Sequence, residues 1–242
     1  MGAYSTKGDF AYELVRNKIL FHEYPPGATL NQATMAQELG ISTTPLREAL
    51  RRLKSEGLVD LDAHRDAHVT QLSAEEARDL LEIRLALDPL AAALAAERRT
   101  NADIAEIRAA SAVRALSNHP SVTDLVAHRR FHRAIYAASH NDILVSTLDA
   151  LWDKADRYRL VGLEVERDQA ERDEKEEEHQ QIMQMVISGD GEGAAETMHK
   201  HIQSSLGAKA AWRMAIRTTR APRFQPTLDD TDGRTRHDAK HS

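Results

Sequence analysis

The chain has 242 residues, of which 41% are hydrophobic and 5% aromatic, and its formal net charge is −6 at pH 7. This length suits two domains with a substantial core, and the absence of cysteine excludes disulfides and thiolate metal sites. With no long apolar run and no signal-peptide pattern, we expect a cytoplasmic protein with no membrane partner. The acidic balance argues against a protein that coats nucleic acid, so any DNA contact must come from a local basic patch.

The first elements predicted are short helices. Asp9–His22 carries an inner apolar stripe and is followed by two prolines and a glycine, which end a helix. Two further helices joined by a turn lie within Asn31–Leu58. Gly40 ends the first of them, and Thr43 or Thr44 is expected to cap the second.

The second helix of this pair has an apolar seam and a basic outer face. The seam residues recur at helical spacing: Leu46, Ala49, Leu50 and Leu53. Thr44, Arg47 and Arg51 share a different face. Such a helix suits the DNA major groove, where Arg47 and Arg51 would contact phosphates or guanine edges. A helical hairpin with a solvated basic face is the alternative.

Two short strands are predicted next, at Leu58–Leu61 and Ala67–Thr70. A helix, a helix-turn-helix and a β-hairpin follow one another in a winged helix. His64 and Arg65 in the wing are candidates to contact DNA, although a solvated hairpin without a DNA contact would have the same sequence pattern. The predicted DNA-binding domain covers residues 1–72.

From Ser73 onward the apolar residues keep a helical period. This pattern predicts an antiparallel all-α bundle over residues 73–218 of a mainly α protein, followed by a disordered tail at 219–242. The predicted helices are Ala74–Arg98, Ala102–Ser117, Val122–Ser139, Ile143–Leu163, Glu166–Ser188 and Glu192–Arg217.

Four histidines lie on inward stripes of this bundle. His128 and His132 are four residues apart on one helix. His179 and His201 stand at similar distances on either side of a turn near Asp190, so an antiparallel hairpin would bring them to the same height. Converging imidazoles could bind Zn, Ni, Cu or Fe. The alternative is four separate histidines, each satisfied by a hydrogen bond.

A rival pattern consists of two Glu-x-x-His motifs, at Glu176/His179 and Glu196/His199. This motif is typical of di-iron carboxylate bundles, which also need a glutamate from each of two further helices. The predicted helix Val122–Ser139 contains no glutamate, so we disfavour a di-iron site.

The sequence resembles a GntR-family transcription regulator of the FadR-like group with an FCD effector domain. The resemblance covers about residues 8–217. It is carried by the recognition-helix signature, the opening of the effector domain and three histidine blocks: Ser42–Leu53, Glu82–Arg84 with Asp88–Ala92, Phe131–Ile135, Glu178–Ile182 and Met198–His201. It implies a homodimer that reads a palindromic double-stranded operator through Thr43, Thr44, Arg47 and Arg51.

The resemblance also implies one divalent transition metal ion per subunit, held by His132, His179 and His201. The usual fourth ligand is an aspartate, and here that position is His128. Replacing an anionic ligand by a neutral one adds positive charge, which favours Zn or Ni and attracts an anionic effector. Arg84 matches a position facing the effector and could fork onto the carboxylate of a small organic acid. An Arg84–Asp88 pair on one helix is the alternative.

Two departures from the family pattern concern DNA. Thr43 stands where arginine is usual, and the wing lacks glycine, so the operator cannot be inferred from relatives. The function predicted is a ligand-responsive transcription regulator rather than an enzyme, since no His-Glu-x-x-His motif is present. A metalloenzyme on a helical bundle and a dedicated metal sensor are the alternatives.

Overall fold

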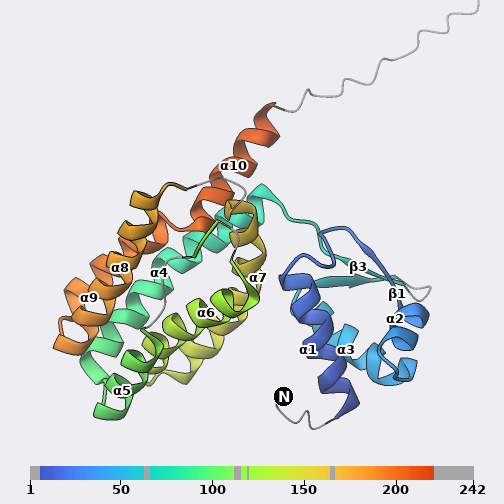
Figure 1. Ribbon diagram of the computed structural model, residues 1–242, viewed down its shortest axis with the longest axis horizontal. Helices are drawn as coiled ribbons and strands as arrows, with labels where there is room; N and C mark the ends of the chain where they lie inside the picture. The colour runs from blue at the N-terminus through green and yellow to red at the C-terminus, as the bar shows by residue number, and fades with distance from the viewer. Residues whose placement is uncertain (1–5, 63–65, 112–115, 119, 164–166, 221–242) are drawn as a thin grey trace, which may run out of the picture.

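The computed structural model describes residues 6–62, 66–111, 116–118, 120–163 and 167–220, which form two lobes joined by an extended segment (Figure 1). The N-terminal lobe contains α1 (Lys7–Leu20), β1 (Thr29–Asn31), α2 (Gln32–Glu38), α3 (Thr43–Ser55), β2 (Val59–Leu61) and β3 (Asp66–Val69). The C-terminal lobe contains α4 (Ala74–Arg98), α5 (Asn101–Ala110), α6 (Val122–Ala137), α7 (Asp142–Leu163), α8 (Gln169–Ser188), α9 (Gly191–Gln203) and α10 (Leu206–Arg220).

The apolar seam of α3 forms the centre of the N-terminal lobe. Leu46, Leu50 and Leu53 are fully buried there and pack against α1. The three strands form an antiparallel sheet in the order β1-β3-β2. The sequence did not predict β1, because a strand of three residues is too short to show an alternating pattern.

The start of α3 corrects a prediction. Its N-cap is Ser42 rather than Thr43 or Thr44, and the Ser42 side chain makes no capping hydrogen bond. A capping side chain accepts from the second or third N–H of the helix, and the third residue here is Pro45, which has none. Thr43 and Thr44 thereby enter the first turn as exposed helical residues.

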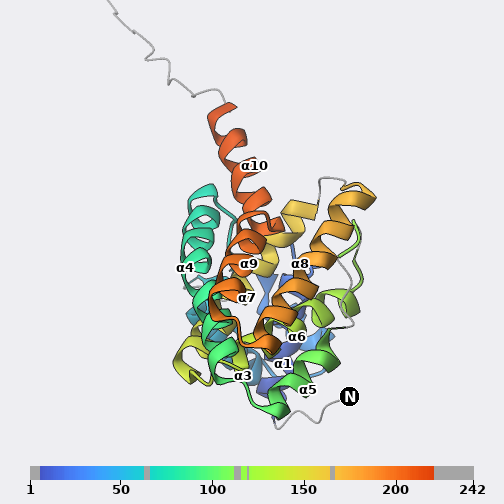
Figure 2. The ribbon, with the colours of Figure 1, turned by 90° about the vertical axis from the view of Figure 1, so that its left-hand side faces the viewer.

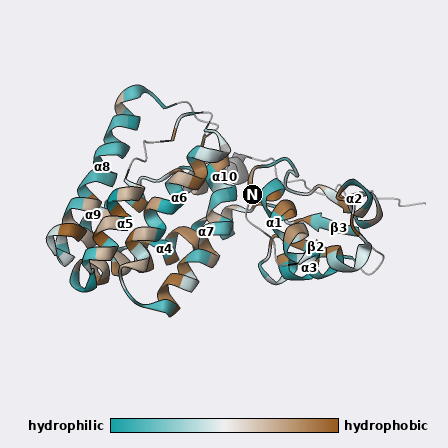
Figure 3. Cartoon of the chain, turned by 60° about the horizontal axis from the view of Figure 1, so that its bottom comes forward, coloured by the Kyte–Doolittle hydropathy of each residue, from teal (hydrophilic) through white to brown (hydrophobic). Residues whose placement is uncertain are grey.

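The C-terminal lobe is a helical bundle built around α4. Small alanine side chains let α4 pack closely against α9. Figure 3 shows hydrophobic residues between the helices and a largely hydrophilic α8. Gly189, with φ +87°, ends α8, and its N–H bonds to the Met185 carbonyl at 3.1 Å. This left-handed turn folds α8 back along α9.

The last predicted helix, Glu192–Arg217, is in fact two. Ser204 donates its hydroxyl to the Lys200 carbonyl at 2.8 Å, and the Ser205 hydroxyl accepts the Ala208 N–H at 3.3 Å. These bonds compete with the helical ladder and separate α9 from α10. α10 packs on α7 and α4, and its C-terminal half extends away from the bundle (Figures 1 and 2). The disordered tail predicted at 219–242 starts too early, because residues 219 and 220 still belong to α10. Residues 221–242 lie outside the described part of the chain.

α7 carries the contacts between the lobes. Asp153 accepts from the Arg16 Nε on α1 at 3.0 Å. Arg157 donates to the Thr70 hydroxyl at 2.6 Å, and the Tyr158 hydroxyl accepts the Ser73 N–H at 3.1 Å. The joining segment is thus fastened to α7 just before α4 begins. No helix among the described residues is long and apolar enough to cross a bilayer.

Candidate metal centre and DNA-binding face

The outer face of α3 presents Thr43, Thr44, Arg47 and Arg51 to solvent. Arg47 donates from Nε to the Gln32 amide oxygen at 3.3 Å. Arg51 forms no hydrogen bond or ion pair with any residue of the described ranges, so it is available to a ligand. The predicted wing residues His64 and Arg65 lie outside those ranges.

Arg52, the next basic residue of α3, is engaged within the lobe instead. Its guanidinium lies 3.6 Å from the centre of the Tyr12 ring and 3.4 Å from a Glu56 carboxylate oxygen. The basic surface of α3 that remains open is therefore the side carrying Arg47 and Arg51.

Three helices bring four histidines together. α6 supplies His128 and His132, α8 supplies His179 and α9 supplies His201, and one ring nitrogen from each lies within 4.8 Å of the others. The His179 and His201 ring centres are 4.7 Å apart across the α8–α9 turn, as the spacing in the sequence predicts. All four side chains are buried.

Groups behind the rings fix two of their orientations. The His201 Nδ1 lies 2.7 Å from a Glu178 carboxylate oxygen and so carries the proton, which leaves the Nε2 lone pair free. The Tyr136 hydroxyl donates to Asp88 at 2.9 Å and lies 3.5 Å from the His132 Nδ1.

Several of the remaining ring nitrogens have no hydrogen-bond partner. Within the described residues these are the His128 Nδ1, the His132 Nε2 and both nitrogens of His179. Buried polar atoms without partners are costly. Each neutral imidazole offers one lone pair, so these three rings and the His201 Nε2 together offer the four that a tetrahedral divalent ion needs. The alternative of four separately hydrogen-bonded histidines does not describe this arrangement.

The environment keeps these imidazoles uncharged. Burial lowers the pKa of His128, His132 and His179 well below 6.5, and for His128 the nearby Arg159 guanidinium lowers it further. Burial alone would raise the pKa of Glu178, but hydrogen bonds from His201 and Lys175 outweigh it and bring the pKa to about 2. Neutral imidazoles backed by a carboxylate are in the state that metal binding requires.

The di-iron pattern is not assembled. Glu196 pairs with Lys200 at 2.6 Å, and His199 beside it is exposed. Neither residue belongs to the histidine cluster found among the described residues.

A cavity of about 230 Å³ lies beside the four histidines. Its wall carries five cationic side chains, namely Arg84, Arg159, Arg167, Lys175 and Lys209. Arg84 is buried and donates to Asp88 at 2.6 Å, while its Nε has no partner in the described residues. The alternative, an Arg84–Asp88 pair, is present in a buried rather than an exposed setting. Arg84 also lines the cavity, and its role toward an effector stays a prediction.

Comparison with known proteins identifies both lobes. The model of bacterial regulatory proteins of the gntR family matches residues 7–69, and the FCD domain model matches residues 79–204. The chain belongs to the GntR family and carries an FCD domain. It is a transcriptional regulator with a GntR DNA-binding domain and an FCD effector domain, and the predicted fold class is confirmed.

Curated relatives span most of this GntR regulator. The HTH-type transcriptional repressor GlaR of Escherichia coli is 27% identical over 202 residues, covering 81% of this chain and 92% of GlaR. The putative L-lactate dehydrogenase operon regulatory protein of the same species is 30% identical over 193 residues, covering 69% of this chain and 72% of its own. These relatives and families are regulators rather than enzymes, so the metalloenzyme alternative is abandoned.

The solved structure of E. coli McbR/YncC shares the fold of this regulator. It aligns with a TM-score of 0.73 at 23% identity over 88% of this chain and 100% of that chain. This likeness supports the arrangement of the two lobes.

Sequence reasoning missed two arginines of this FCD cavity. Arg159 continues the buried stripe of α7 that runs through Leu148, Trp152 and Ala155, so its place on an apolar face was a signal that could have revealed it. Its guanidinium lies 4.5 Å from the Trp152 ring centre. Arg167 falls within the predicted helix Glu166–Ser188, but α8 begins only at Gln169 after its N-cap Asp168, so Arg167 lies before the helix.

Proposed function

We propose that this regulator binds a palindromic operator as a homodimer and responds to a small organic acid bound beside a metal ion in its FCD domain. One observation carries the proposal: four buried, uncharged imidazoles converge at the wall of a cavity lined by cations. Nitrogen donors select a transition metal, and the cations select an anion.

His128, His132, His179 and His201 would hold the ion. An all-imidazole set favours Zn²⁺ or Ni²⁺ over harder ions such as Mg²⁺. When bound, the ion supplies a positive charge, and a carboxylate oxygen of the effector can complete its coordination. Arg84 lies on the same cavity wall, where its guanidinium would hold the carboxylate of the effector.

The exposed face of α3 would enter the major groove. Arg47 and Arg51 would contact base edges or phosphates, and Thr43 and Thr44 would contact the backbone at the start of the helix. His64 and Arg65, which lie outside the described residues, would contact the DNA backbone. A two-fold symmetric protein requires a two-fold symmetric operator.

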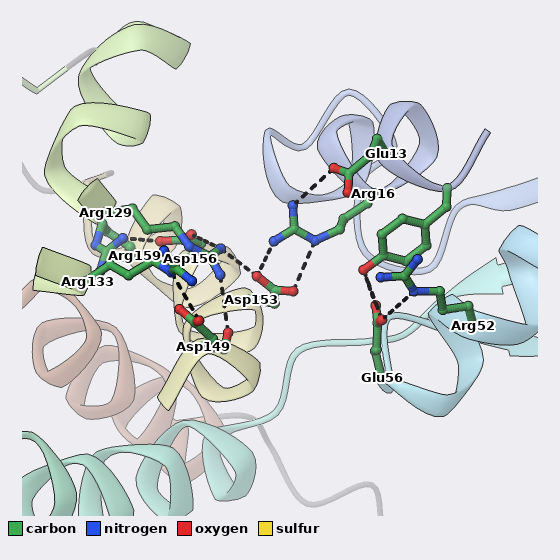
Figure 4. A network of polar contacts seen from close by, with 11 residues as sticks. Glu13, Arg16, Arg52, Glu56, Arg129, Arg133, Asp149, Asp153, Asp156 and Arg159 are labelled. Atoms are coloured by element: carbon green, nitrogen blue, oxygen red, sulfur yellow. Dashed lines mark hydrogen bonds and ion pairs between the residues drawn. The ribbon is translucent and has the colours of Figure 1, made fainter. Parts of the chain in front are cut away.

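Ion pairs link the cavity to the DNA-binding lobe (Figure 4). Arg159 faces the cavity and pairs with Asp156, which lies 3.5 Å from Arg129 on α6. Arg129 also donates to Asp153 at 2.5 Å, and Asp153 accepts from Arg16 of α1. An effector that prefers one arrangement of these side chains would shift the placement of the α3 helices.

Metal and DNA binding can be tested on the full chain. Titration with Zn²⁺, followed by elemental analysis, is expected to give one tightly held ion per subunit, and His179→Ala should lose it. His199→Ala, on the exposed face of α9, is the matched control. A wild-type protein that retains no Zn²⁺ or Ni²⁺ after desalting contradicts the metal site.

Operator binding needs a selected duplex, obtained by enriching random DNA on the wild-type protein. Arg47→Ala should weaken specific binding by about 1–3 kcal/mol, the value of a good base contact. Arg130→Ala, an exposed arginine of α6, serves as the control. An Arg47→Ala protein that binds the selected duplex normally contradicts the assignment of α3.

A further inference from the structure

The five cations on the wall of the cavity beside the histidines are matched by five nearby carboxylates. Two acidic residues, Glu171 and Glu174, share its wall with the five cations. Behind the wall, Asp88 pairs with Arg84, Asp156 with Arg159 and Glu178 with Lys175. Cations and carboxylates therefore balance before any metal ion is bound.

A divalent ion disturbs this balance. The four residues around it are imidazoles, which bind metal in their neutral form and bring no negative charge. The loaded site therefore carries two positive charges that the described residues do not compensate. A monocarboxylate would cancel one of them, and a dianion would cancel both.

Arg167 supplies a second anchoring point. Its side chain is 6% exposed and lines the cavity. It donates to the carbonyls of Leu116 and of Ser117, the latter at 3.1 Å, while its Nε has no partner among the described residues. Of the five cavity cations, it is the one without a carboxylate partner in the described ranges. A buried guanidinium in this state is suited to a carboxylate ligand.

We infer that the effector is a small dicarboxylate with one carboxylate at the metal ion, near Arg84, and the other at Arg167. This inference rests on the proposed function. A cavity of about 230 Å³ has the volume of roughly eight water molecules, since each occupies about 30 Å³ in the liquid. It therefore has room for a diacid of roughly four or five carbons, whose non-hydrogen atoms are similar in number.

Matched acids test the inference on the Zn²⁺-loaded protein. Isothermal titration would compare succinate with butyrate and glutarate with valerate, with inorganic phosphate as a compact anion. Each diacid is expected to bind at least about tenfold more tightly than the monoacid of equal length. The reason is that one additional charged hydrogen bond increases the affinity by at least about tenfold. Zinc content is measured before and after each titration.

Variants place the second carboxylate. Arg167→Gln should reduce the ratio of diacid to monoacid affinity to near one, and Arg167→Lys should keep part of it. Arg130→Gln, which lies outside the cavity, should leave the ratio unchanged. If circular dichroism shows that Arg167→Gln is unfolded, the inference is tested by the ratio of diacid to monoacid affinity in Arg167→Lys and in the wild-type protein.

The outcomes separate the two proposals. Equal affinity for diacids and monoacids in the wild-type protein, or an unchanged ratio in Arg167→Gln, overturns the dicarboxylate inference while zinc-dependent acid binding still supports the proposed function. Phosphate that binds more tightly than either diacid also overturns it. Failure to bind zinc and any acid overturns the proposed function itself.

Discussion

Glu178 and Tyr136 hold two histidine rings from behind, and neither touches the space where an ion would lie. Glu178 fixes the proton of His201 on Nδ1, and Tyr136 links His132 to the buried Asp88. The geometry of the cluster therefore depends on residues that would not themselves be ligands.

Removing the carboxylate behind His201 should weaken metal binding without removing a ligand. Glu178→Gln is expected to lower zinc affinity about 10–100-fold, the usual effect of such supporting groups. Competition with a chromophoric chelator would measure it. Glu177→Gln, one position along on the exposed face of α8, should leave the affinity unchanged.

The metal-free protein should lose stability in mild acid. The folded pKa of His128, His132 and His179 lies well below the value of 6.5 expected in the unfolded chain. The unfolded chain therefore takes up protons first, so these histidines contribute fully above pH 6.5 and progressively less below it. Below pH 6.5, each of these histidines lowers the free energy of unfolding by up to about 1.4 kcal/mol per pH unit.

Urea unfolding between pH 5 and 7.5 would measure this slope. His179→Gln should flatten it, whereas His199→Gln should not. Equal slopes in the wild-type protein and His179→Gln would show that the buried ring does not remain neutral in the folded state.

The sequence predicted helices well where one face is buried, and predicted helix ends poorly where side-chain hydrogen bonds to the backbone interrupt the helix. The periods of α4, α6 and α7 gave their bounds to within about two residues, because tertiary burial and helical spacing agree there. The Ser204–Ser205 break escaped notice because serine is tolerated in helices. The histidines were found since they lie on apolar stripes, whereas Arg167 lies between helices, where position depends on tertiary packing alone.

The crossing of α7 and α10 depends on a missing side chain. A Cβ on Gly162 would overlap the Leu206 carbonyl. Gly162→Ala should cost about 1–3 kcal/mol of stability, as overpacking does, despite the better helix propensity of alanine. Thermal unfolding would show it. Gly207→Ala, where a Cβ meets only the Ser205 hydroxyl at 3.6 Å, should be neutral or slightly stabilising.

Across the whole molecule, the two lobes meet through a few polar contacts of α7. Asp153 has partners on both sides, Arg16 on α1 and Arg129 on α6, and its side chain is 13% exposed. Contacts of this kind fix an orientation but bury little apolar surface, so the seam is suited to changing with the state of the bundle.

Removing the polar contacts of Asp153 should weaken the attachment between the two lobes while the metal site stays intact. Asp153→Asn is expected to accelerate proteolysis of the joining segment, residues 70–73, several-fold, because Arg16 loses its charged partner in the C-terminal lobe. Asp149→Asn removes an ion pair with Arg133 that stays within the bundle, so it is the control. Zinc affinity should be the same in both. Equal cleavage rates would place the fastening elsewhere on α7.

The joint at Ser204 and Ser205 has a consequence for engineering. Its residues and Leu206 line the cavity, yet they follow His201 in the chain and belong to none of the three helices that carry the clustered histidines. Changes there alter the room for a guest molecule while the imidazoles keep their helices. A library randomised at these three positions is therefore the direct route to a biosensor that answers to a different acid.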